Sequence, residues 1–472
     1  MDISQHFNFV ESVLEQANAT SAAFIQGDQV LTYGQLAKNI RSTATWLAGQ
    51  GLHPEQRVAI IMRDGSDMAT IILACMYAGM VAVPLDPRSS IGNLRHCVDH
   101  SGSKLVITED HEIKEKLELS GVTVHTRGVT DHAYRCQLAS PTRTHRDAAA
   151  IFMYTSGTTG HPKAVVHSQS APWIIGNSMG QQTLGWRADD ISFATAKLFF
   201  SFGLFNLWNT LVAGAATIFN PGISMPNVLA DIITQHKPTI MISVPALWGK
   251  LLRYDLSGNA LRICLSGGDR LPPTLITAWM SHTNLYLYNI YGSTETGTAF
   301  TYCDRLDRPG SIGRAVSGYD LEIRDNELFV RAPSAGICYW HDREWSARMF
   351  GEWMPTGDIV SRDKDGYYYY LGRASDVVKV NGKYVDMANL EHLLMQCPGV
   401  SEAVVVGQQD ALGHTRLKAY VVAESGQEPD TQNLGRHVRN NSTDFLREIE
   451  LVDALPRTEN GKVQRYKLRQ LM

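Results

Sequence analysis

Short apolar runs rich in β-branched residues alternate along most of the chain with segments that have the periodicity of amphipathic helices. The runs are VAIIM at 58–62, KLVIT at 104–108, IFMYT at 151–155, TIMISV at 239–244 and LRICLS at 261–266. Such alternation is typical of α/β folds with largely parallel sheets. The pattern therefore predicts a large α/β body made of several subdomains.

The C-terminal part of the chain has a different pattern. A charged, turn-rich segment ends near GRASD at 372–376, and a compact β-α-β pattern follows in DVVKV, ANLEHLLMQ and SEAVVVG. A strand in LKAYVVA, a helix around 431–440 and a strand in EIELVD complete it. Because single hydrophobic cores stop growing at roughly 250 to 300 residues, a chain of 472 residues should form two or more domains. We predict a boundary at 373–376, between a large N-terminal domain (1–373) and a small, mobile α+β domain (376–472).

Two uncharged stretches resemble membrane segments at first sight. Residues 68–85 carry no charge, but Gly79 and Pro84 divide them into a short helix and a strand. Residues 198–230 are also uncharged, yet they contain Asn206 and other amides that lipid would penalise. We therefore expect no membrane span, and we interpret residues 198–230 as the wall of a buried pocket.

Composition restricts the class of protein further. The chain is 44% apolar and 19% charged with a net charge of −4, which lacks the basic excess expected of a nucleic-acid-binding protein. The seven cysteines are scattered without C-x-x-C spacing, and the first residues contain no basic segment of a secretory signal. We expect a cytoplasmic protein with reduced thiols and no nucleic-acid partner.

The run YTSGTTGHPK at 154–163 follows directly from a predicted strand. Backbone N–H groups and hydroxyls in such a glycine-rich loop can converge on phosphate oxygens. The run is not a Walker loop, because Pro162 precedes the lysine and Ala164 follows it. Taken alone, it is either a different kind of phosphate loop or a flexible Ser/Thr/Gly turn.

Four further motifs follow this run in a fixed order: YGSTE at 291–295, PTGD at 355–358, GRASD at 372–376 and PRTENGKVQR at 456–465. In this order the motifs resemble the adenylate-forming superfamily of acyl-CoA synthetases, adenylation domains and luciferases, from about residue 20 to residue 470. Within the superfamily, three segments are most similar to benzoate-type aryl-CoA ligases. They are KLFFSFGLFN at 197–206, SVPALW at 243–248 and SGGDRLP at 266–272.

The resemblance implies an AMP-forming ligase. Such an enzyme joins a carboxylate to the α-phosphate of ATP, releases pyrophosphate, and then transfers the acyl group from the acyl-AMP to the thiol of CoA. Its site needs phosphate donors, Mg²⁺, a cation near the carboxylate and a nucleoside pocket. The resemblance gives Thr294 a bond to the α-phosphate and Glu295 the Mg²⁺.

The remaining nucleotide contacts also come from the resemblance. It places Tyr291 against the adenine and gives the ribose hydroxyls to Asp358, with help from Arg373. The implied phosphate-binding residues are Thr155, Ser156, Gly157, Thr158, Thr159, Gly160 and Lys163. The implied nucleoside-binding residues are Gly267, Gly268, Asn289, Tyr291, Gly292, Ser293, Asp358 and Arg373.

Three C-terminal residues have implied roles in catalysis and domain movement. Lys462 would bridge the carboxylate and the α-phosphate during adenylation. After a rotation of the small domain, the loop around Gly382 would line the tunnel through which the thiol enters. The hinge position is usually Asp or Lys in the superfamily and is Ser375 here, which bears on the thioester step.

The acid is best described as aryl or compact and cyclic. No carboxylate occurs between residues 191 and 230, so the ammonium of an α-amino acid would lack its usual partner. Aromatic side chains there suit a flat apolar ring, although core packing explains any single one equally well. The predicted acyl-pocket residues are Phe199, Phe202, Phe205, Trp208 and Thr298.

Three acceptors remain open. CoA ranks first, although no cluster of basic residues in the sequence marks a site for its 3′-phosphate. The phosphopantetheine of a carrier protein and an amine such as an amino acid are the alternatives. A non-catalytic nucleotide sensor is a remote fourth reading, because Glu295 and Lys462 are both present.

Overall fold

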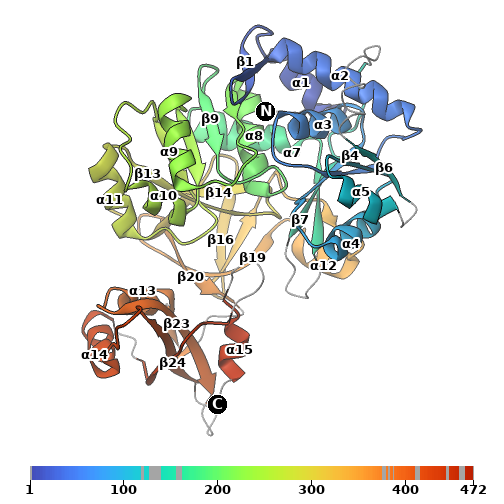
Figure 1. Cartoon of the computed structure of the whole chain (residues 1–472). Helices are drawn as coiled ribbons and strands as arrows, with labels where there is room; N and C mark the ends of the chain where they lie inside the picture. The colour runs from blue at the N-terminus through green and yellow to red at the C-terminus, as the bar shows by residue number, and fades with distance from the viewer. Residues whose placement is uncertain are drawn as a thin grey trace. The chain divides into compact units, whose positions relative to one another are not determined.

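The computed structural model (Figure 1) describes residues 3–118, 122–126, 140–155, 162–374, 379–380, 383–385, 387–409, 415–442, 446–456 and 463–470. The chain forms two compact units. The first contains Met1–Asp320 and Val330–Met354, and the second contains Leu321–Phe329 and Pro355–Met472. The boundary predicted at 373–376 stays a prediction, because residues 375–378 lie outside the described part of the chain.

One sheet of the first unit has the strand order β18-β8-β7-β4-β3-β5-β6. Strands β4, β3, β5 and β6 pair in parallel, β7 pairs with β4 in parallel, and β8 returns antiparallel to β7. The strands are β3 (Arg57–Ile61), β4 (Val81–Leu85), β5 (Leu105–Thr108), β6 (Thr123–Thr126), β7 (Ala149–Thr155), β8 (Lys163–Ser168) and β18 (Cys338–Tyr339).

Among the described residues, a second sheet has thirteen strands, of which the nine that lie wholly in this unit run in the order β15-β14-β13-β12-β11-β9-β10-β1-β2. Its middle, from β13 to β1, is parallel, whereas β14, β15 and β2 pair antiparallel. The strands are β1 (Ala22–Gln26), β2 (Gln29–Thr32), β9 (Ile191–Ala194), β10 (Ala216–Ile218), β11 (Ile240–Ser243), β12 (Ile263–Ser266), β13 (Leu287–Ser293), β14 (Thr298–Cys303) and β15 (Ser311–Ala315). The predicted α/β class with largely parallel sheets is confirmed.

Helices cover these sheets, with α4 and α5 beside β4 to β6, and α9, α10 and α11 grouped together (Figure 1). Their apolar faces pack with the strands into cores that include Trp248, Trp279 and Phe152. The helices are α1 (Phe9–Gln16), α2 (Tyr33–Gly49), α3 (Ser66–Tyr77), α4 (Ile91–Ser101), α5 (His111–Glu118), α7 (Ala171–Ile175), the π-helix Gly176–Thr183, α8 (Ser201–Ala213), α9 (Pro226–Gln235), α10 (Pro245–Leu251), α11 (Pro273–Thr283) and α12 (Arg343–Met349).

The division predicted within residues 68–85 is confirmed. The segment forms most of α3 and all of β4, and Gly79, with a φ of +69°, lies in the turn between them. Every residue from Met68 to Tyr77 is buried, which explains a helix that is apolar on all sides. Among the helices of the described part of the chain, none is both long enough and apolar enough to span a bilayer.

The second unit carries its own cores around Leu390, Val405 and Tyr420. Strands β23, β24 and β25 form one sheet, in which β24 pairs antiparallel with β23 and in parallel with β25. Three of the elements named here, β16, β17 and β19, contain residues assigned to each of the two units. The elements are β16 (Asp320–Arg324), β17 (Glu327–Arg331), β19 (Met354–Arg362), β20 (Tyr368–Arg373), β21 (Lys379–Val380), β22 (Lys383–Tyr384), α13 (Met387–Met395), β23 (Val400–Gln409), β24 (Thr415–Ala423), α14 (Thr431–Asn441), β25 (Glu448–Leu451) and α15 (Arg465–Gln470).

Candidate active site

The two ends of the glycine-rich run are fixed by a β-hairpin. Thr155 is the last residue of β7, Lys163 is the first of β8, and the two are direct partners in the antiparallel ladder. Both side chains are partly exposed. The ladder therefore delivers the two ends of the run to one point. The predicted phosphate-binding residues between them, Ser156, Gly157, Thr158, Thr159 and Gly160, lie outside the described residues.

The YGSTE motif forms a tight connection from β13 to β14. At Gly292 the register shifts, and a Cβ there would lie 2.1 Å from the carbonyl oxygen of Thr298, so only glycine fits. Within the turn, the Ser293 N–H donates to Thr296 Oγ1 at 3.2 Å, and the Thr296 N–H donates to Ser293 Oγ at 3.3 Å. The Tyr291 ring meets the Phe300 ring edge-on. The motif is a braced turn, and its polar residues follow directly from a strand end.

Thr294 and Glu295 are held by residues from distant elements. Nε2 of His167 donates to the Thr294 carbonyl oxygen at 2.9 Å, and the Tyr339 hydroxyl donates to Glu295 Oε1 at 2.8 Å. Burial lowers the pKa of His167, so the ring is neutral near pH 7. The sequence did not single out His167 or Tyr339, because neither belongs to a spaced motif.

The predicted nucleoside residues Gly267 and Gly268 follow β12 directly. A Cβ on Gly267 would lie 2.9 Å from Ile290 Cγ1 and 3.3 Å from Phe202 Cζ, so the glycine lets β13 and α8 approach. Gly268 has a φ of +81°, which favours glycine. Asn289 is buried and donates through Nδ2 to the Ser311 carbonyl oxygen at 2.8 Å, which ties β13 to the first residue of β15.

The aromatic segment meets the YGSTE turn at the start of α8. Ser201 Oγ lies 3.2 Å from Thr294 Oγ1, and both residues are half-buried. The Phe202 ring stacks on the Phe205 ring with centroids 6.2 Å apart. Ser201 was not predicted, because its position inside a run of aromatics carries no sign of a partner ninety-three residues away.

The other predicted acyl-pocket residues are more deeply placed. Trp208 is fully buried and meets the Phe9 ring edge-on at 5.4 Å, and Phe199 is 8% exposed. Thr298 is buried, and its hydroxyl donates to the Ala299 carbonyl oxygen at 3.1 Å. The aromatic residues thus extend from the partly exposed start of α8 into the core behind it.

In the second unit, Asp358 and Arg373 are partners across β19 and β20. Arg373 Nε lies 3.2 Å from Asp358 Oδ1, and Arg373 Nη1 donates to the Thr356 carbonyl oxygen at 2.9 Å. The Asp358 side chain is 4% exposed and that of Arg373 is 56% exposed. The pair can present a carboxylate and a guanidinium to one ligand.

The two ends of the last motif, at residues 456 and 464–465, are also held by contacts within the second unit. The Gln464 N–H donates to the Pro456 carbonyl oxygen at 2.7 Å, and Arg465 Nη2 donates to Glu391 Oε2 at 3.1 Å. The predicted catalytic Lys462, hinge Ser375 and tunnel residue Gly382 lie outside the described residues. Their roles stay predictions.

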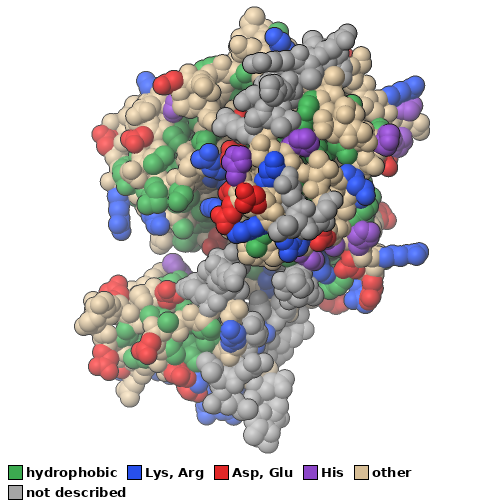
Figure 2. All heavy atoms as spheres, turned by 45° about the vertical axis from the view of Figure 1, so that its right-hand side comes forward, with side chains coloured by type: hydrophobic (Ala, Val, Ile, Leu, Met, Phe, Trp, Pro, Cys, Tyr) green, Lys and Arg blue, Asp and Glu red, His purple; other side chains and the backbone are tan. Residues whose placement is uncertain are grey.

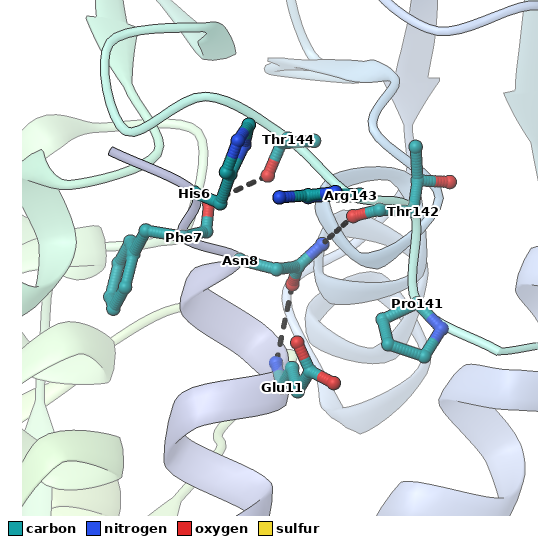
Figure 3. Close-up of a pocket in the computed structure, with 8 residues that line it drawn as sticks. All are labelled: His6, Phe7, Asn8, Glu11, Pro141, Thr142, Arg143 and Thr144. Atoms are coloured by element: carbon teal, nitrogen blue, oxygen red, sulfur yellow. Dashed lines mark hydrogen bonds between the residues drawn. The ribbon is translucent and has the colours of Figure 1, made fainter. Parts of the chain in front are cut away.

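Two cavities lie away from these motifs. One, of about 230 Å³, is bounded by residues 6–8, Glu11 and residues 141–144 (Figure 3). Asn8 there donates to the Thr142 carbonyl oxygen at 3.2 Å and accepts from the Glu11 N–H at 3.2 Å. These polar groups tie the N-terminal segment to the body, so we interpret this cavity as a structural seam.

The other cavity, of about 280 Å³, lies between α14 and β25 in the second unit. Arg436, Arg439 and Arg447 line it together with Glu448, and all three arginines are exposed. Lys and Arg side chains elsewhere are interspersed with Asp and Glu over the face in Figure 2. The fold therefore assembles a basic cluster that was not recognised in the sequence.

Comparison with known proteins extends over the whole chain. The family model of the AMP-binding enzyme matches residues 10–339, and that of the AMP-binding enzyme C-terminal domain matches residues 389–462. The 4-hydroxybenzoate–CoA/benzoate–CoA ligase of Rhodopseudomonas palustris is 31% identical over 100% of this chain and 94% of its own length. The p-hydroxybenzoic acid–AMP ligase of Mycobacterium tuberculosis is 28% identical over 95% of this chain and 66% of its own length.

Solved structures give the same result. An anthranilate CoA ligase in complex with anthranoyl-AMP has a TM-score of 0.89 and 28% identity, over 99% of this chain and 98% of its own. A benzoate CoA ligase from Burkholderia xenovorans has a TM-score of 0.86 and 29% identity, over 98% of this chain and 100% of its own. The chain therefore belongs to the AMP-binding enzyme family, the adenylate-forming superfamily that its motifs resemble.

Proposed function

We propose that this enzyme activates a small aryl carboxylic acid as acyl-AMP, releases pyrophosphate, and transfers the acyl group to the thiol of CoA. One observation carries the proposal within the first unit. The aromatic segment and the YGSTE turn meet where Ser201 Oγ lies 3.2 Å from Thr294 Oγ1. An acid beside α8 and an α-phosphate at Thr294 would then have their reacting atoms close together, which is the main requirement of the first step.

The nucleotide would be held by the residues that the motifs provide. Thr155 and Lys163 would bind the terminal phosphates, Thr294 the α-phosphate, and Asp358 with Arg373 the ribose. The two strand ends and the braced turn support these roles, because fixed backbone lets donors act without reorganisation. Lys462 would supply the cation that bridges carboxylate and α-phosphate.

Glu295 fits a Mg²⁺ ion. The carboxylate is half-buried, and the Tyr339 hydroxyl orients it through Oε1. Within the described ranges no cluster of three candidate ligand side chains occurs. That suits Mg²⁺, which usually takes one or two carboxylates and completes its shell with phosphate oxygens and water. When bound, the ion would neutralise phosphate charge.

The acid is proposed to be benzoate or a hydroxy- or aminobenzoate. Relatives and a solved structure that are named for benzoate, hydroxybenzoate and anthranilate match nearly the whole chain. The stacked rings of Phe202 and Phe205 beside Ser201 offer a flat apolar surface next to one hydroxyl.

CoA is the acceptor that the second unit favours. The arginine-lined cavity offers positive charge for a phosphate-bearing ligand, and CoA carries a 3′-phosphate and a pyrophosphate. The p-hydroxybenzoic acid–AMP ligase supports a second candidate, in which the acyl-AMP is passed to another acceptor. Ser375 at the hinge position is a further reason to test the thioester step separately.

The test measures pyrophosphate release with benzoate, the hydroxybenzoates, the aminobenzoates and α-amino acids, each with and without CoA. We expect release with at least one aryl acid, stimulation by CoA, and an aryl-CoA product identified by mass. Alpha-amino acids should react at least about tenfold more slowly, because a buried ammonium would be unpaired. An acyl-AMP that accumulates and never yields a thioester would support the second candidate instead.

A further inference from the structure

Lys163 is held in the first unit by residues of a segment about 180 positions later in the chain. Its Nζ lies 3.2 Å from Asp342 Oδ2, and the side chains are 22% and 28% exposed. The other carboxylate oxygen of Asp342 accepts from the Trp345 N–H at 3.1 Å, which caps α12. The carboxylate is therefore fixed by the helix and can act as a rigid partner for the lysine.

Aromatic faces complete the surroundings of the ammonium. Lys163 Nζ lies 4.7 Å from the centroid of the Trp345 ring and 5.9 Å from that of Tyr339, within the range of cation–π attraction. The Tyr339 hydroxyl reaches Glu295. The same short segment therefore contacts the lysine predicted to bind phosphate and the glutamate predicted to bind Mg²⁺.

The backbone fixes this arrangement. Strand β18 pairs with β8, with Tyr339 opposite Val165 and Cys338 opposite Val166. Lys163 begins the same strand β8. A lysine side chain would otherwise lose up to about 2 kcal/mol of rotamer entropy when a ligand immobilises it. Here Asp342 and the aromatic rings already hold the side chain, so this entropy is lost on folding and not on ligand binding.

We propose that Asp342 and Trp345 are positioning residues of the nucleotide site, which hold the ammonium of Lys163 ready for the terminal phosphates of ATP. This rests on the proposed function. An ammonium has three N–H donors, so Lys163 can keep its bond to Asp342 and still donate to phosphate. The two residues act through Lys163 and need not touch the nucleotide.

The experiment compares KM for ATP, KM for the aryl acid and kcat in pyrophosphate release. Asp342→Asn keeps the helix cap but removes the charge, and Trp345→Leu removes the aromatic face. We expect each to raise KM for ATP by about five- to tenfold, with KM for the acid unchanged. Trp345→Phe, which keeps a ring, should restore most of the affinity.

Glu344→Gln is the matched control, because it makes the same change of charge on the first turn of α12. Glu344 is exposed, and its carboxylate pairs with Arg348 instead of Lys163. Melting temperatures of all variants are compared with this control, so that a folding defect is recognised as such. A calorimetric Kd for ATP gives a second readout that does not depend on turnover.

Lys163→Ala separates the two levels of the proposal. If it weakens ATP binding while Asp342→Asn and Trp345→Leu stay within about twofold of the control, the positioning role is wrong and the proposed function stands. A lower KM for ATP in Asp342→Asn would also overturn the role, because Asp342 would then compete with phosphate. If Lys163→Ala leaves ATP binding intact, the phosphate role of Lys163 itself is wrong.

Discussion

Individual residues in the first unit are placed by partners far away in sequence, and a buried ion pair shows what this costs. Asp64 is 6% exposed, lies 4.0 Å from Lys197 Nζ, and accepts from the Leu198 N–H at 2.9 Å through Oδ1. Burial raises the pKa of Asp64 to about 6, although the Lys197 charge and the Leu198 N–H oppose the shift. Burial also lowers the pKa of Lys197, so the charged pair is desolvated on both sides.

The stability of the first unit should therefore depend on the ionisation of Asp64. Because the folded pKa is above the ordinary value of 3.8, stability is greatest below pH 4 and is lost as pH rises through about 6. The full shift corresponds to roughly 3 kcal/mol, of which about 1 kcal/mol is already lost at pH 4.5. From pH 4.5 to pH 7.5, the free energy of unfolding of the wild type should therefore fall by about 2 kcal/mol relative to that of Asp64→Asn.

Urea unfolding followed by tryptophan fluorescence measures this directly. All nine tryptophans lie between residues 46 and 353, in the first unit, so the signal reports that unit alone. Asp99→Asn, at an exposed site on α4, serves as the control. If the free energies of unfolding of Asp64→Asn and the wild type differed by the same amount at every pH in this range, the raised pKa of Asp64 would be refuted.

The same residues mark the limit of what the sequence could predict. Glu295 and Lys163 were identified because the motifs place them at recognisable spacings. Tyr339 and Asp342, which hold these two residues, and His167, which holds Thr294, were missed. Each acts through a contact that only the pairing of β18 with β8 or the packing of β8 against the YGSTE turn creates. Motifs record the chemistry of the ligand, whereas supporting side chains depend on tertiary packing.

At the scale of elements, the periodicity of the sequence predicted individual helices and strands. It did not predict which elements lie beside one another. The apolar residues of α3 and the helix predicted around 431–440, observed as α14 from Thr431 to Asn441, follow from local pattern. The basic cavity does not. Arg436 and Arg439 share a face of α14 at i, i+3 spacing, but Arg447 joins them only because the chain returns beside the helix into β25.

This cavity predicts a preference for CoA over 3′-dephospho-CoA. If the three arginines bind the 3′-phosphate, the wild type should have a KM for CoA at least about tenfold lower than its KM for 3′-dephospho-CoA. Each charge-assisted contact adds about 1 kcal/mol of binding free energy. Replacing Arg436, Arg439 and Arg447 by Gln should abolish that preference and leave pyrophosphate release without CoA unchanged. Lys467→Gln, an exposed charge on α15, is the control. Equal rises in both KM values would contradict the assignment.

At the scale of the whole molecule, the second unit should contribute to both half-reactions, through Lys462 to the first and through the arginine cluster to the second. The phosphate, acyl and metal residues proposed here lie in the first unit, whereas Lys462 belongs to the motif whose C-terminal end is held in the second by Arg465 and Glu391. A cation about 4 Å from an anionic oxygen at an effective dielectric near 20 is worth about 4 kcal/mol. We therefore expect Lys462→Ala to slow acyl-AMP formation by at least about 100-fold.

The thioester step gives the decisive comparison for Lys462. When synthetic aryl-AMP and CoA are supplied, Lys462→Ala should form aryl-CoA at nearly the wild-type rate, because the bond to the α-phosphate already exists and no repulsion between anions has to be overcome. The arginine variants should behave in the opposite way, with normal acyl-AMP formation and impaired use of CoA. Equal losses in both half-reactions for Lys462→Ala would mean that the lysine maintains the fold of the second unit. In that case, the charge that brings carboxylate and α-phosphate together would have to come from elsewhere in the protein.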